Sequence, residues 1–163
     1  MKCMVFRLMI VLAFFFGIST TQNVTAAKKS MLPLQIGIYV PEEVECPKLG
    51  SIDKNKYAFN QYPESAIAIY GDGFGSNDGN CFSYNFTHVT KKGNIFIIKG
   101  DVITGAGGHN MGDFDMTISV NSTTSFSVIK ADGILPYYID NNKKKIIRYR
   151  YCGNPDNIKY PLE

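Results

Sequence analysis

The chain has 163 residues, of which 45% are hydrophobic and 19% are charged, with 15 glycines, 7 prolines and no tryptophan. This length and composition exclude a collagen-like or disordered chain and indicate a single domain. The formal net charge is +3, and without Lys2 and Arg7, which lie in a predicted leader, 15 cations face 14 anions. A nearly neutral chain gives no electrostatic reason to expect binding to nucleic acid or to an acidic membrane.

Residues 1–26 follow the three-part plan of a secretory signal peptide. Lys2 and Arg7 precede an apolar run from Leu8 to Ile18, and the segment ends in small residues at Ala26. The apolar run is too short for a membrane-spanning helix, which needs about 20 residues. We therefore predict a signal peptide over 1–26, one domain over 27–163, and a secreted or periplasmic protein without a membrane anchor.

Three cysteines remain after the leader: Cys46, Cys81 and Cys152. In an oxidising compartment they predict one disulfide and one further thiol. Each possible pairing would stabilise the fold by roughly 4–5 kcal/mol in the chain-entropy model, so energy does not choose among them. We favour Cys46 with Cys81, because Cys46 lies in a proline-flanked stretch that a tether would fix. The cysteines are too far apart in sequence for a zinc site, and we predict no metal and no cofactor.

Beyond the leader, apolar residues recur with a period of two, as in half-buried strands. The first predicted strand, 34–40, places Leu34, Ile36, Ile38 and Val40 on one face. A long connection over 42–63 follows, then strands at 65–70, 81–89 and 94–103. The last two are joined by a tight turn at 91–94, where Gly93 supplies the positive φ that such hairpins require.

The second half of the chain continues the same pattern. Strand 113–120 sets Phe114, Met116, Ile118 and Val120 on one face, and strand 125–130 points Phe126 and Val128 inward. Further strands are predicted at 135–139 and 146–152, with turns at 121–124, 131–133 and 140–143. About eight short strands with short turns indicate an antiparallel meander.

We therefore predict an all-β fold, a small antiparallel up-and-down barrel, with a β-sandwich as the alternative. Closure into a barrel hides one face of the sheet and removes its exposed edges. A leader followed by a small disulfide-bearing barrel resembles the plan of exported lipocalin-like and lysozyme-inhibitor-like proteins, in architecture and not in residue motifs.

Two glycine-rich segments, 71–80 and 105–113, are predicted to be loops at one end of the barrel. The first lacks the ligand spacing of a calcium loop, and the second lacks the helix and lysine of a phosphate loop. Loops on a rigid sheet commonly carry binding functions, and glycine lets the backbone approach a partner closely. The candidate contact residues are Asp72, Phe74, Asn77, Asp78, His109, Asn110 and Met111.

The first functional hypothesis is a secreted or periplasmic, non-enzymatic binding or inhibitor protein with a protein partner. The alternative is a carrier of a small apolar ligand, since an eight-stranded barrel can hold one small molecule. A third hypothesis is a small hydrolase that uses His109 with Asp113 or Asp115. The sequence has two histidines and no Gly-x-Ser-x-Gly motif, so we do not predict an enzyme.

Two further patterns stand outside these hypotheses. Lys143–Lys145, Arg148 and Arg150 form a basic strip, which we interpret as a solvated face that prevents edge-to-edge aggregation, or alternatively as a contact for an acidic partner. Asn85-Phe86-Thr87 and Asn121-Ser122-Thr123 satisfy the N-glycosylation triplet, which matters only in a eukaryotic source.

Overall fold

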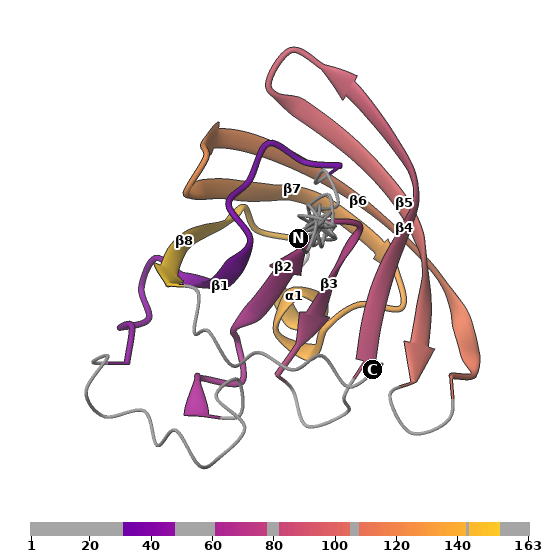
Figure 1. The fold of residues 1–163 in the computed structure, drawn as a ribbon, viewed down its shortest axis with the longest axis horizontal. Coiled ribbons are helices and arrows are strands. Elements are labelled where there is room, and N and C mark those ends of the chain that lie inside the picture. Colours follow the sequence, from indigo (N-terminus) through magenta and orange to yellow (C-terminus); the bar gives the residue numbers. More distant parts are fainter. Residues whose placement is uncertain (1–30, 48–60, 78–81, 105–107, 143, 154–163) are drawn as a thin grey trace, which may run out of the picture.

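A computed structural model describes residues 31–47, 61–77, 82–104, 108–142 and 144–153. The predicted signal peptide lies outside the described residues, as do Asp78 and Cys81. Eight antiparallel strands form a closed barrel in chain order, and β8 pairs with β1 to complete it (Figure 1). The predicted up-and-down barrel is therefore confirmed, and the sandwich alternative is wrong.

The elements follow one another along the chain with one short helix before the last strand. Their bounds are β1 Gly37–Pro41, β2 Ile67–Tyr70, β3 Gly73–Ser76, β4 Phe82–Lys92, β5 Ile95–Thr104, β6 Asn110–Ser122, β7 Ser125–Gly133, α1 Tyr137–Asn142 and β8 Ile147–Gly153. The predicted β4–β5 hairpin is confirmed, with Gly93 at a φ of 64° in its turn.

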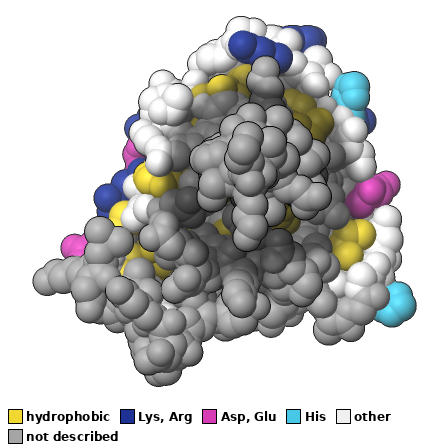
Figure 2. Space-filling model, in the orientation of Figure 1, with side chains coloured by type: hydrophobic (Ala, Val, Ile, Leu, Met, Phe, Trp, Pro, Cys, Tyr) yellow, Lys and Arg dark blue, Asp and Glu magenta, His cyan; other side chains and the backbone are white. Residues whose placement is uncertain are grey.

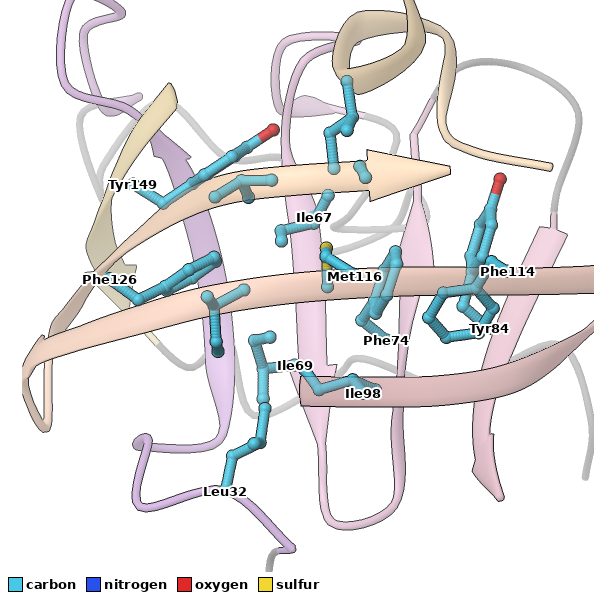
Figure 3. Close-up of a cluster of buried hydrophobic side chains, with 14 of the residues drawn as sticks. Leu32, Ile67, Ile69, Phe74, Tyr84, Ile98, Phe114, Met116, Phe126 and Tyr149 are labelled. Carbon is cyan, nitrogen blue, oxygen red and sulfur yellow. The ribbon is translucent and has the colours of Figure 1, made fainter. Parts of the chain in front are cut away.

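Aromatic and aliphatic side chains pack together inside the barrel (Figure 3). Phe74 stacks on Tyr84 with ring centroids 4.5 Å apart, and Phe126 stacks on Tyr149 at 5.1 Å. The ring of Phe114 meets both Phe74 and Tyr84 edge to face. Such pairs each add about 0.5–1.5 kcal/mol beyond the burial of their area, so these rings are a main source of stability.

Each end of the barrel is closed by a different segment. The turn end carries the short β2–β3, β4–β5 and β6–β7 turns, and the loop end carries the connections β1–β2, β3–β4, β5–β6 and β7–β8. At the turn end, Leu32 and Leu34 are buried in the main core. The backbone amide of Gln35 donates to the Thr123 carbonyl at 2.8 Å. At the loop end, Leu135 and Ile139 of the α1 region join the same core.

The predicted face of the first strand is wrong. Tyr39 points into the barrel, whereas Ile38 and Val40 lie on the outer face in a second apolar cluster. Ile36 precedes the strand and is 38% exposed. The outer cluster contains Ile38, Val40, Tyr62, Ala66 and Ala68, with Val44, Cys46 and Cys152 packed against it. Because other chain segments cover its outer face, β1 is buried on both sides, and alternation does not show which face is inside.

The disulfide joins Cys46 to Cys152, with Cα atoms 5.6 Å apart, so the favoured pairing of Cys46 with Cys81 is wrong. The cause is barrel closure. Because β1 pairs with β8, the chain that leaves β1 passes beside the end of β8. Arg150 strengthens this crossing, since its Nη2 donates to the Val44 carbonyl at 2.9 Å.

Four other predicted segments also need correction. The predicted turn 131–133 continues β7, and the predicted strand 135–139 and turn 140–143 are replaced by α1 over residues 137–142. Leu135 and Ile139 are four residues apart, which suits one face of a helix as well as one face of a strand. In the other direction, the predicted loop 71–80 contains β3. The count of eight strands therefore agrees only because one strand was missed and one was wrongly predicted.

Candidate functional site

A groove of about 450 Å³ lies on the outer surface of the barrel, across β4 to β7. Four aspartates from three strands line it, together with one lysine. Its lining residues are Thr87, Lys99, Gly100, Asp101, Asp113, Phe114, Asp115, Asp132 and Gly133. Sequence reasoning considered Asp113 and Asp115 only as partners of His109 and missed the other members of this group.

A glycine and a strand irregularity lie where the groove crosses β5 and β4. A Cβ added at Gly100 would lie 2.1 Å from the Asn85 carbonyl oxygen and 2.5 Å from Cε1 of Phe114. The neighbouring strand β4 shifts its register between Phe86 and His88, which is a β-bulge. Bulges and interior glycines bend a sheet and allow close approach. The missing side chain at Gly100 therefore lets the buried Phe114 ring pack closely against β5, at the position where the groove crosses this strand.

The aspartates face one another across the strands. Asp101 lies opposite Asp113, and Asp115 lies opposite Asp132. Like charges in these positions destabilise a sheet. Lys99 Nζ is 3.7 Å from Asp115 Oδ1, but both side chains are well exposed, and such surface pairs contribute little. The groove therefore carries an excess of negative charge, which would attract a cationic group from outside the protein.

The structure divides the predicted contact residues among three places. Asp72 lies in the β2–β3 turn, at the turn end, where its carbonyl accepts the Phe86 amide at 2.8 Å. Phe74 is fully buried in the core, so its side chain presents no contact surface. Asn77 follows β3 at the loop end, and its Nδ2 donates to the Tyr62 carbonyl at 2.6 Å. The expectation that the 71–80 segment forms one exposed loop is therefore wrong.

The second predicted segment retains an exposed surface at the loop end. His109, Asn110 and Met111 are exposed, and half of the Met111 surface, 50%, is accessible to solvent. Asn110 Oδ1 accepts the Gly112 amide at 2.7 Å, which fixes the start of β6. Asp113 follows in the same strand and lines the acidic groove. The loop-end surface and the groove are thus joined through β6.

Two further observations bear on chemistry. Within the ranges that the structure describes, no group of three His, Cys, Asp or Glu side chains is placed to hold a metal ion. His109 is exposed, and its backbone carbonyl accepts a hydrogen bond from the Thr104 backbone amide at 3.1 Å. The described contacts therefore include no pairing of His109 with either aspartate of the hydrolase hypothesis.

A second groove of about 240 Å³ lies between the segment that follows β1, α1 and the start of β8, and it carries mixed charge. The Tyr138 hydroxyl donates to Oε1 of Glu43, and this bond lowers the pKa of the Glu43 carboxyl. Burial, with the Glu43 hydrogen bond second, raises the pKa of Tyr138 to about 12. This contact ties α1 to the segment after β1.

The basic strip is partly used inside the protein. Arg148 is exposed and Arg150 is half-buried, and they alternate along β8 with the buried Ile147 and Tyr149. Arg148 lies 4.0 Å from Glu42, and Arg150 holds the Val44 carbonyl. On the face shown in Figure 2, lysine and arginine side chains stand apart around the rim and do not gather in one patch.

Comparison with known proteins places the chain in no family: no family model, curated protein or solved structure matches it. In the part of the chain that the structure describes, none of the helical segments has the length and hydrophobicity that a membrane-spanning helix requires.

Proposed function

We propose that this protein is an exported, non-enzymatic binding protein that contacts a protein partner through the loop end and the adjoining acidic groove. Such binding would inhibit the partner if the contact covers the partner's own functional site. Export is supported by the pattern of residues 1–26 and by the Cys46–Cys152 disulfide, because disulfides persist mainly in oxidising compartments.

The observation that carries this proposal is the filled interior. An eight-stranded barrel either fills its interior with side chains or holds one small ligand. Here the stacked pairs Phe74–Tyr84 and Phe126–Tyr149 occupy it, and both barrel ends are closed by leucine and isoleucine side chains. This arrangement favours a contact on the outer surface over the carrier hypothesis.

The chemistry of the surface indicates the kind of partner. Met111 offers an exposed, flexible apolar side chain, which adapts to different partner shapes. The groove beside it contains four aspartates and one lysine. A partner with basic side chains around an apolar residue would complement both features, and the opposite charges would speed association.

A photo-crosslinking amino acid at Met111 should therefore form an adduct with one protein of the native extracellular or periplasmic fluid. The same probe at Lys92, which is exposed at the β4–β5 turn of the turn end, is the matched control and should form none. Intact-mass analysis and peptide mapping of the adduct identify both partners.

Charge gives a second readout of the same experiment. Asp101→Asn together with Asp113→Asn should reduce the Met111 adduct, most strongly at low salt, where surface charges are least screened. Equal adduct yields from positions 111 and 92 would count against a contact at the loop end. A yield that does not respond to the aspartate substitutions would remove the groove from the contact surface.

A further inference from the structure

The two N-glycosylation triplets occupy very different places in the barrel. Asn121-Ser122-Thr123 lies where β6 ends at the turn end, and Asn85-Phe86-Thr87 lies within β4. A glycan needs an asparagine whose amide nitrogen reaches solvent and neighbours that tolerate a bulky, hydrated group. The two settings differ on both requirements.

Asn121 meets both requirements. Its side chain is exposed, and the register of β6 against β7 shifts between Val120 and Ser122, so Asn121 lies at a bulge. Asn121 Nδ2 donates one hydrogen bond to Ser127 Oγ at 3.1 Å. An asparagine amide has two hydrogens. One can therefore be replaced by a sugar while the other keeps the bond to Ser127.

The rest of this triplet is also open. Ser122 and Thr123 are exposed. The backbone carbonyl of Thr123 accepts hydrogen bonds from the Gln35 backbone amide at 2.8 Å and from the Tyr39 hydroxyl at 3.1 Å. A glycan at this turn would extend away from the sheet without displacing a core residue.

Asn85 has a more confined setting. It is half-buried and has a partner on each side, with Gly73 of β3 opposite it on one edge and Asp101 of β5 on the other. The middle residue of the triplet, Phe86, is buried in the core, and Thr87 Oγ1 donates to the Lys99 carbonyl at 3.2 Å. A glycan here would also stand beside Asp101 of the acidic groove.

We propose that Asn121 carries an N-linked glycan and that Asn85 does not. This inference rests on the proposed export, in a eukaryotic secretory pathway. In the reaction, the Asn121 amide nitrogen bonds to the anomeric carbon of an oligosaccharide carried on a lipid diphosphate. The bond from that carbon to the diphosphate breaks, and the amide proton is released with the lipid diphosphate.

The glycan would prevent a protein partner from contacting the turn end of the barrel. The β6–β7 turn lies at the opposite barrel end from His109, Asn110 and Met111. A hydrated oligosaccharide at Asn121 would shield the turn end and leave the loop end and the groove uncovered.

The test is secretion of the full chain from eukaryotic cells, followed by peptide N-glycosidase treatment in heavy-oxygen water and peptide mass mapping. The wild type should lose the mass of one oligosaccharide and acquire the heavy-oxygen label at position 121 alone. Asn121→Gln and Thr123→Ala should each abolish the mass loss. Asn85→Gln and the conservative Thr123→Ser should both retain it.

Each of the remaining outcomes contradicts one part of the inference or the proposed export. A secreted, folded chain without label at position 121 overturns the inference while the proposed export stands. Label at position 85 overturns the discrimination between the two triplets. A chain that stays in the cytosol contradicts the export itself, and the inference falls with it.

Discussion

Phe74→Ala should lower the free energy of unfolding by about 3–5 kcal/mol, the usual cost of removing a buried phenylalanine. Phe74 is fully buried, its ring stacks on Tyr84, and it meets Phe114 edge to face. Removing the ring leaves a cavity between two aromatic neighbours that belong to other strands. Urea unfolding followed by circular dichroism measures the change.

Met111→Ala is the matched control, because it also truncates a large apolar side chain of a predicted contact loop. Met111 is 50% exposed, so its loss should change the free energy of unfolding by less than about 0.5 kcal/mol. If the two variants had equal stability, Phe74 would lie in an exposed loop as its glycine-rich sequence suggests, and β3 would not exist.

Loss of the disulfide should have a comparable effect. Cys46→Ser and Cys152→Ser should each cost about 4–5 kcal/mol, because the bond joins residues 106 positions apart and restricts the unfolded chain strongly. This is a large part of the 5–15 kcal/mol that stabilises a typical domain. The two variants should therefore unfold at much lower urea concentrations than the wild type.

The third cysteine supplies the control for this prediction. Cys81→Ser leaves the Cys46–Cys152 bond in place, so it should not show the loss expected for the other two variants. Peptide mapping without reduction should recover Cys46 and Cys152 in one linked fragment. A linked fragment of Cys46 with Cys81, and a large loss of stability in Cys81→Ser, would refute the pairing.

The barrel itself could be predicted from the sequence because its longest strands are each buried on one face. In β6, Phe114, Met116 and Ile118 are buried, while Asp113 and Asp115 are exposed. Local turn chemistry at Gly93 then fixed the β4–β5 pairing. A series of such hairpins closes into a barrel, since an open meander would leave edges exposed.

The errors have a common physical origin in contacts made by distant parts of the chain. β1 is buried on both faces, so the alternation of Ile36, Ile38 and Val40 did not identify the inner residue, Tyr39. In β3, Phe74 stands between Gly73 and Gly75, and a single apolar residue shows no period. The spacing of Leu135 and Ile139 fits a strand or a helix, and packing against the barrel end selects the helix.

The acidic groove was out of reach for a similar reason. Asp101, Asp113 and Asp132 are distributed over three strands, and each alone looks like an ordinary outward-facing residue. Their juxtaposition depends on the register of β5, β6 and β7, which includes a shift between Val102 and Ile103. Alternation predicts which residues face outward, whereas register decides which of them meet.

Native mass spectrometry of the protein isolated from its natural fluid tests the central claim most directly, namely that side chains fill the barrel and function lies on its outer surface. The account predicts the mass of the polypeptide with its covalent modifications and no apolar compound released on unfolding. A small apolar molecule bound in a one-to-one ratio and released only when the barrel unfolds would contradict it and establish a carrier.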